Sequence, residues 1–445
     1  MVIELFIASF IRVVSNFLHF IYIHAFKNQM ETIGMNQKQY GILSLPVIIG
    51  ALGYFVDIYD LLLFSIIRVP SLKSLGLTDA QIAGDGLFIL NIQMIGLLLG
   101  GILWGVLADK KGRLKVLFAS IILYSIGNIA NGFVQTVHQY ALVRFISGIG
   151  LAGELGAGIT LVSELLPKEK RGLGTSMVAG IGLTGAVFAF FIKELFEWRT
   201  CYFIGGGLGL LLLLLRVGVL ESGMFQSLQH KNVRKGDFFM LFSNRKYFLK
   251  YIKAILIGLP TWYVIGILIS FSKEFGTHMH IQGTVDPGKA VMYAYVAISI
   301  GDILVGFLSQ ALQSRKKAVF IFYGITALSI VWFFNLQGQS VNMLYLVAAI
   351  LGFGTGFWAI FVTMAAEQFG TNIRATVATT VPNMVRGSLV LVSLLFTGLQ
   401  TYTDYLTSAW ITGIVVMLIA VVSAWYTEET FHKDLNYVEV DEVLP

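Results

Sequence analysis

The sequence is poor in charged residues and almost free of cysteine. Only 13% of its 445 residues are Asp, Glu, Lys or Arg, whereas a soluble chain carries roughly 25%. So little charge leaves too few polar side chains to cover a water-soluble globule, which excludes two or three soluble domains of this total length. The single cysteine, Cys201, excludes an intramolecular disulfide bond and a zinc site built on cysteines. No nucleotide-binding loop of the form GxxxxGK followed by Ser or Thr occurs, so ATP is not expected to be the energy source.

Apolar residues are what the sequence has in abundance. They make up 56% of the chain, glycine occurs 47 times, and the mean hydropathy is +0.77. A membrane-spanning helix needs about 20 mostly apolar residues, and small residues let such helices pack closely. The composition therefore predicts an all-α, multi-pass membrane protein. Twelve stretches have a suitable length: 42–66, 86–108, 114–133, 138–162, 173–193, 198–219, 251–271, 289–312, 317–336, 341–365, 376–400 and 407–427.

The lysines and arginines predict how these spans are oriented. With both ends of the chain in the cytoplasm, twenty of these residues fall on cytoplasmic segments and six on the opposite side. Such an excess marks the cytoplasmic face of a membrane protein. The same distribution accounts for the pI near 9.1 without nucleic-acid binding. We expect a protein of the cytoplasmic (inner or plasma) membrane.

A long polar stretch divides the twelve spans into two sets of six. We expect an N-terminal bundle over 41–220, a cytoplasmic linker over 221–250, a C-terminal bundle over 251–428 and a cytoplasmic tail over 429–445. The apolar segment within 1–40 is interrupted by charged and polar residues. It is expected to be an interfacial helix or a disordered extension, and a start codon placed too early would also explain it.

Two loop patterns recur in the second half of the chain, which predicts a duplicated six-helix unit. GVLADKKGR follows the second span, and the related GFLSQALQSRKK follows the eighth. After the fourth span, Glu164 precedes Arg171 by seven residues, and after the tenth span Glu367 precedes Arg374 by the same interval. Two unrelated patterns with nearly one offset indicate two pseudo-symmetric bundles.

These motifs resemble those of the major facilitator superfamily over about residues 40–430. GVLADKKGR is similar to the superfamily's signature loop, RFISGIGLAGE to its fourth-helix motif, and RVGVLES to its charged motif after the sixth helix. VDIYDLLLF, together with GIGLAGELGAG, SELLPKEKRG and EWRTCYFIGG, looks closest to proton-coupled metabolite, sugar and phosphate symporters. The resemblance implies the twelve-helix major facilitator fold and a secondary transporter that works by alternating access.

The expected function is proton-coupled symport of a small anionic metabolite of the carboxylate type, by a monomer without a cofactor. A sugar porter or facilitator and a phosphate symporter are alternatives, although Leu155 stands where phosphate symporters have a tyrosine. A non-transporting membrane receptor is the alternative of a different class. No nucleophile–base set is visible, so an enzyme is not expected. His278 and His280 lack the further ligands that a metal site needs.

Ionisable residues inside the spans are candidates for proton coupling, because charge buried in a membrane is costly. Asp60 and Arg144 each lie six residues from the outer end of their span, at a depth of roughly 9 Å. An acid and a base at equal depth can form a pair, and separating the pair favours protonation of the acid. The resemblance supports this pairing, and a purely structural ion pair is the alternative. Asp57, one turn away, and Glu154, in the inner half of the fourth span, are further candidates.

A second group of residues lies on spans that are expected to line a substrate site. Arg386 lies ten residues into its span, roughly 15 Å deep, where substrates of such transporters bind. A guanidinium without a partner there would attract a carboxylate or a phosphate. Its charge could instead be compensated by Asp302 or by the amide of Asn383. The aromatic candidates for this site are Trp262, Tyr263 and Trp358.

The loop motifs are expected to hold the cytoplasmic side shut rather than to touch substrate. Asp109 can sit against the positive N-terminus of a neighbouring helix, and Arg113 can reach Glu164. In the second half the acid position is taken by Gln310 or Ser309, so the corresponding latch is expected to be weaker. Loop folding and topology alone are the alternative role. The expected gate consists of Gly105, Asp109, Gly112, Arg113, Glu164, Arg171, Arg216, Glu221, Glu367 and Arg374.

Overall fold

The computed structural model describes residues 44–111, 113–154, 168–220, 238–370 and 373–433. Within these ranges the chain is helical apart from turns and short connections, and no strand is present. Ten helical segments there are long and apolar enough to cross a membrane, and Lys115–Asn131 is a shorter apolar helix. These elements agree with the twelve-helix architecture expected from the sequence.

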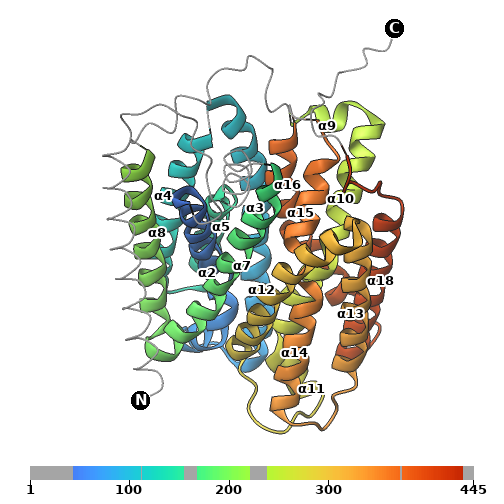
Figure 1. The fold of residues 1–445 in the computed structure, drawn as a ribbon. Helices are drawn as coiled ribbons and strands as arrows, with labels where there is room; N and C mark the ends of the chain where they lie inside the picture. Colours follow the sequence, from blue (N-terminus) through green and yellow to red (C-terminus); the bar gives the residue numbers. More distant parts are fainter. Residues whose placement is uncertain (1–43, 112, 155–167, 221–237, 371–372, 434–445) are drawn as a thin grey trace.

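The first half of the chain packs into one helical bundle, coloured blue to green in Figure 1. In it, α2 packs on α7 and α8, α3 on α5, and α4 on α5 and α8. The bounds are α2 Leu45–Ser74, α3 Asp79–Lys111, α4 Arg113–Asn131, α5 Val137–Leu151, α7 Lys168–Leu195 and α8 Trp198–Leu220.

The second half forms the other bundle, coloured yellow-green to red (Figure 1). Here α12 packs on α14, α13 on α14 and α18, and α10 on α16 and α18. The bounds are α9 Met240–Ser243, α10 Arg245–Tyr263, η2 Val264–Ile269, α11 Ser272–His278, α12 Pro287–Leu312, α13 Arg315–Phe334, α14 Val341–Thr355, α15 Trp358–Glu367, α16 Arg374–Gly387, α17 Leu389–Leu399 and α18 Tyr405–Trp425.

Short polar residues mark where many of these helices begin. An oxygen of each such side chain accepts a hydrogen bond from a backbone N–H in the first turn, which compensates one of the N–H groups that a helix leaves unpaired. The described residues with this role include Thr136, Asp286, Ser314, Ser340 and Asp404. They lie in the short connections, so the spans are delimited by their caps as well as by their apolar content.

Two glycines at equivalent places show that the halves repeat in space as well as in sequence. A Cβ atom on Gly148 of α5 would collide with the backbone oxygen of Gln93 on α3. A Cβ atom on Gly352 of α14 would collide with the backbone oxygen of Ala294 on α12. Both contacts require a residue without a side chain, because the two backbones approach too closely for any other. The sequence offset between the two contacts is close to that of the loop motifs.

The two bundles meet along a few helix pairs. In Figure 1, α7 and α12 run side by side between the halves. Helix α3 contacts α16 and α17, and α2 contacts α12. Side chains on α2, α3, α7, α12 and α16 can therefore join the halves.

Helix α2 extends further than the sequence predicts. It ends at Ser74 instead of residue 66, and Asp60 consequently lies fourteen residues from its end, about 21 Å along the axis. The predicted end lies just before the charge of Arg68. That charge is compensated by Glu274, so the helix continues through it. Asp57 and Asp60 are therefore deeper in the bundle than expected.

Helices of the second half are interrupted near their middles. Helix α10 continues as the π-helix η2, α14 gives way to α15 at Gly356 and Phe357, and α16 gives way to α17 at Ser388. Irregular helix turns of this kind are frequent at functional sites. Two of the sequence candidates, Trp358 and Arg386, lie within two residues of such a break.

Candidate substrate and coupling site

A buried ion pair joins the two bundles at the centre of the protein. Nη2 of Arg386 on α16 lies 3.5 Å from Oδ2 of Asp57 on α2, and the side chains are 1% and 0% exposed. Nη1 of Arg386 donates to Oδ1 of Asn383 at 3.3 Å. The Nδ2 amide of Asn383 in turn donates to the backbone oxygen of Ala152, the residue that follows α5, at 2.8 Å. Arg386 is thus neutralised by Asp57 and bound by Asn383, which was one of its two expected alternative partners, whereas Asp302, the other, does not contact it.

The pair leaves hydrogen-bonding capacity unused. Oδ1 of Asp57 and Nε of Arg386 are buried and have no hydrogen-bond partner among the described residues. The 3.5 Å contact is also longer than a strong charge-assisted hydrogen bond. Because each group retains free positions, Arg386 can accept another anion and Asp57 can accept a proton.

Two tyrosines near this pair were not predicted. Tyr54 on α2 and Tyr295 on α12 are buried, and both interact electrostatically with Asp57 and Arg386. No described residue forms a hydrogen bond with either hydroxyl. Helical spacing could have indicated them, because Tyr54 precedes Asp57 by three residues and Tyr295 precedes Asp302 by seven, which places each pair on one face.

Asp302 and Trp358 meet at the break between α14 and α15. Oδ1 of Asp302 accepts a hydrogen bond of 2.8 Å from the backbone N–H of Ala359, in the first turn of α15. Oδ2 of Asp302 and Nε1 of Trp358 are buried without a partner among the described residues. Asp302 therefore caps a helix instead of compensating Arg386, and Trp358 brings an unused N–H donor to the same break.

The other two aromatic candidates have packing contacts. The Oη hydroxyl of Tyr263 donates to the backbone oxygen of Ala409 at 2.7 Å, which ties α10 to α18. Trp262 is buried in the apolar core of the protein. These packing contacts explain the positions of both side chains, so neither residue needs a role in substrate binding.

Asp60 and Arg144 are neighbours, but their side chains do not form the expected ion pair. Nη2 of Arg144 donates to the backbone oxygen of Asp60 at 3.0 Å. Nε donates to Oε1 of Gln93 at 3.2 Å, and Nη1 donates to Oδ1 of Asn128 at 3.4 Å. Both carboxylate oxygens of Asp60 lack a partner among the described residues. The guanidinium hydrogen-bonds to three neutral oxygens, so Arg144 is a positive charge close to Asp60 without an ion-pair contact to its carboxylate.

Glu154 has a partner that the sequence analysis assigned to a different site. Nη1 of Arg216 on α8 donates to Oε2 of Glu154 at 2.9 Å, and Nη2 pairs with Oε1. Both side chains are buried and lie against Gly53 of α2. The bidentate pair connects two helices of one bundle. Glu154 was expected to act in proton coupling and Arg216 in the cytoplasmic gate, but the geometry joins them in one contact.

Glu154→Gln should destabilise the protein by about 3–5 kcal/mol, because it leaves the buried Arg216 guanidinium without a counter-charge. The measurement is the thermal unfolding temperature of the purified protein in detergent. The double variant Glu154→Gln/Arg216→Met should recover most of the loss, since no unpaired charge remains. A single variant as stable as the parent would mean that water or lipid compensates Arg216.

Much of the expected cytoplasmic gate lies outside the described residues. This applies to Gly112, Glu164 and Glu221, and to the side chains of Asp109, Arg113 and Arg171. Of the remaining gate residues in the first half, Gly105 on α3 faces α16, where its Cβ position is 3.2 Å from Cγ2 of Thr380. The signature loop thus begins at a contact between the bundles.

The second-half copy of the gate is described and contains an ion pair. Nη2 of Arg315 lies 3.3 Å from Oε1 of Glu367, the contact expected in the first half between Arg113 and Glu164. Arg374 was expected to repeat the role of Arg171, and its Nε and Nη2 donate to the backbone oxygen of Phe369.

Glu429 supplies a carboxylate that the second copy of the motif lacks. It follows α18 and accepts hydrogen bonds from the hydroxyl of Ser314 and from the backbone N–H groups of Arg315 (3.0 Å) and Lys316 (3.3 Å), at the start of α13. Burial raises the pKa of Glu429, but these hydrogen bonds outweigh it, and the pKa lies below its usual value. The loop motif alone predicted a weak latch, because Glu429 lies far beyond that motif in the sequence.

Sequence comparison assigns the chain to a family. The profile described as the Major Facilitator Superfamily matches residues 5–378. The chain belongs to this superfamily. Among superfamily relatives, the niacin transporter NiaP of Acinetobacter baylyi is 26% identical over 387 residues, which cover 78% of this chain and 84% of the relative. The benzoate transport protein of the same organism is 24% identical over 374 residues, covering 74% and 78%.

A solved structure of the superfamily has the same fold. The proton:xylose symporter XylE, bound to 6-bromo-6-deoxy-D-glucose, superposes with a TM-score of 0.65 at 17% identity and covers 88% of this chain and 97% of its own. Superfamily membership confirms the twelve-helix fold class, and together with the transporter relatives it makes this chain a multi-pass membrane transporter and not an enzyme.

Proposed function

We propose that this superfamily member is a proton-coupled symporter of small carboxylates that carry an apolar, ring-shaped body. The observation that carries the proposal is the ion pair between Asp57 and Arg386, which are buried at the centre and belong to different bundles. Both have unused hydrogen-bonding positions. The pair therefore contains an anion-binding group and a proton-accepting group in direct contact.

In this mechanism the substrate carboxylate and the Asp57 carboxylate compete for Arg386. A proton on Asp57 removes the charge that holds the guanidinium, which then binds the substrate in a bidentate contact. When the proton leaves on the other side of the membrane, Asp57 regains its charge and displaces the substrate. One proton and one carboxylate cross together, so no net charge is moved.

Coupling to movement follows from the position of the two groups. Because Asp57 and Arg386 belong to different bundles, exchanging one partner for another changes the contacts that hold the bundles together. A ligand can shift a conformational equilibrium only through such a difference in interaction between states. We infer alternating access around this pair, in a monomer with both termini in the cytoplasm and the membrane orientation expected from its basic loops.

The substrate class is supported by the names of relatives and by the surroundings of the pair. Niacin and benzoate, the compounds named for two relatives, are both aromatic rings with one carboxylate. Near the pair, Tyr54 and Tyr295 provide ring faces and free hydroxyls, and Trp358 provides a free N–H. Such residues suit an aromatic body with one polar end.

The test is uptake of radiolabelled benzoate and nicotinate by proteoliposomes that contain the purified protein. We expect accumulation when the outside is made acidic, and no accumulation of the neutral amides benzamide and nicotinamide or of xylose. Accumulation of the neutral compounds instead would contradict the role of Arg386. Carboxylate uptake that does not depend on the pH gradient would contradict proton coupling but not carboxylate transport.

A further inference from the structure

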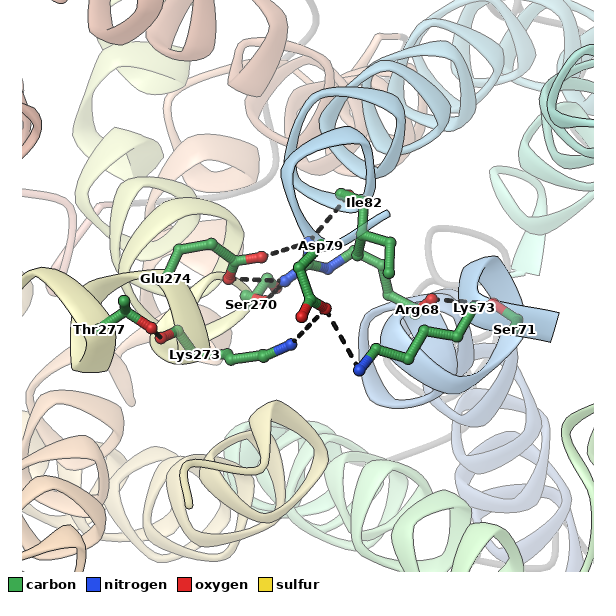
Figure 2. A network of polar contacts seen from close by, with 9 residues as sticks. All are labelled: Arg68, Ser71, Lys73, Asp79, Ile82, Ser270, Lys273, Glu274 and Thr277. Atoms are coloured by element: carbon green, nitrogen blue, oxygen red, sulfur yellow. Dashed lines mark hydrogen bonds and ion pairs between the residues drawn. The ribbon is translucent and has the colours of Figure 1, made fainter. Parts of the chain in front are cut away.

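Near the end of α2, the buried Arg68 connects the two bundles (Figure 2). Its Nη1 and Nη2 each lie 2.8 Å from a carboxylate oxygen of Glu274 on α11. Nη2 also donates to the backbone oxygen of Ser270 at 3.1 Å, and Nη1 donates to that of Ile82 on α3 at 3.2 Å. The guanidinium carbon lies 4.2 Å from the ring centre of Phe271. Of these partners, only Ile82 belongs to the same bundle as Arg68.

Two further groups of ion pairs also join the bundles. Asp79 lies between Lys73 and Lys273, at 3.2 and 3.0 Å (Figure 2). Lys193 on α7 lies 2.7 Å from Asp286, which precedes α12. Asp79 is 66% exposed, whereas Arg68 is 1% exposed. Exposed pairs contribute little and are screened by salt, so Arg68 is the cation whose partner matters most.

Arg68 and Asp57 lie on the same face of α2. Eleven residues separate them, which is three turns of helix and about 16 Å. Each takes part in a pair between bundles, Arg68 with Glu274 and Asp57 with Arg386. Helix α2 therefore takes part in two arginine–carboxylate pairs between the bundles. It supplies the arginine to the pair with Glu274 and the carboxylate to the pair with Arg386.

We propose that Arg68 is a second carboxylate-binding site, which captures the substrate before Arg386 does. This inference rests on the proposed carboxylate transport. For a substrate to enter from the side of the membrane at which α2 ends, the bundles must separate around Arg68. This separation removes Glu274, Ser270 and Phe271 from Arg68. The guanidinium then retains only its hydrogen bond to the backbone oxygen of Ile82 and faces the opening between the bundles. A fork of N–H donors that was paired with one carboxylate is well suited to bind another.

The simpler reading is that Arg68 and Glu274 only form a latch. A latch requires both residues equally, so Arg68→Gln and Glu274→Gln would weaken it in the same way. A capture site requires only the arginine, and Glu274 competes with the substrate for it. The two variants should then change the apparent affinity in opposite directions.

The experiment measures KM for benzoate uptake from the medium by cells that produce each variant, with protein amounts determined on the membrane fraction. We expect Arg68→Gln to raise KM about tenfold or more, the effect of losing one charge-assisted contact. Glu274→Gln should leave KM unchanged or lower it. Lys73→Gln is the matched control: Lys73 is a nearby cation whose ion pair with Asp79 lies within the first bundle. This variant should change KM by less than about twofold. If Arg68→Gln is not produced, Arg68→Lys keeps the charge without the fork and should raise KM by a smaller factor.

Equal changes of KM in Arg68→Gln and Glu274→Gln would overturn the capture site and leave a latch. An unchanged KM in both arginine variants would overturn it as well. If the parent protein takes up no carboxylate at all, the proposed function fails and the capture site fails with it. Uptake by the parent with equal KM changes in the variants refutes the capture site alone.

Discussion

Arg386→Gln is expected to lower kcat/KM for carboxylate uptake by about a hundredfold, which is the effect of removing one member of a buried charge pair. The variant also leaves Asp57 buried without its counter-charge, so a loss of uptake alone could reflect a loss of folding. The double variant Asp57→Asn/Arg386→Gln removes both charges and serves as the matched control. It should unfold at a temperature close to that of the parent and still fail to bind benzoate in a thermal-shift titration. Binding of benzoate by the double variant would show that another cation holds the carboxylate.

Asp57→Asn should uncouple transport from the proton. The amide resembles the protonated acid, so Arg386 remains available and the variant should bind benzoate at least as well as the parent. It should exchange labelled for unlabelled substrate across the membrane. It should not accumulate substrate under a pH gradient, because no proton can leave the amide. The measurement is counterflow and gradient-driven uptake in the same proteoliposomes.

Asp60→Asn is the comparison that distinguishes the two candidate acids. Asp60 is buried and both of its carboxylate oxygens lack a partner among the described residues, so it remains the rival proton site. Under the proposal this variant keeps gradient-driven accumulation. If Asp60→Asn loses accumulation while Asp57→Asn retains it, the coupling acid is Asp60 and the exchange on Arg386 is wrong.

The sequence was sufficient for the fold because membrane spans have a strong local signature. Long apolar runs, basic loops and a repeated loop motif are each visible without knowledge of contacts. Helix α2 runs eight residues past its predicted end and includes Arg68. Its compensation by Glu274, more than two hundred residues away in the chain, has no local signature.

The sequence predicted which residues belong to the candidate site better than it predicted which of them contact each other. Arg386 was identified by its depth in an apolar span, Asp57 by its place one turn from Asp60, and Asn383 as a possible partner of Arg386. Such local positions do not determine which residues face each other across two bundles. Arg144 was correctly placed beside Asp60, yet it contacts the backbone oxygen and not the carboxylate. Such a difference depends on side-chain orientation, which sequence spacing does not specify.

The protein combines long continuous helices with interrupted spans, which include α10, α14 and α16 of the second half and α5, which ends at Leu151, in the first. Helices α2, α3, α7 and α8 are continuous over 30, 33, 28 and 23 residues, whereas the spans built from α10, α14 and α16 each change helix type or break near the middle. A continuous hydrogen-bond ladder resists bending, and an interrupted one forms a hinge. Helices α2, α3, α7 and α8 therefore serve as a stiff reference frame against which the interrupted spans flex. Spectroscopic labels on α7 and α8 would remain at a fixed separation through the transport cycle, and labels on either side of Gly356 would report its internal bending.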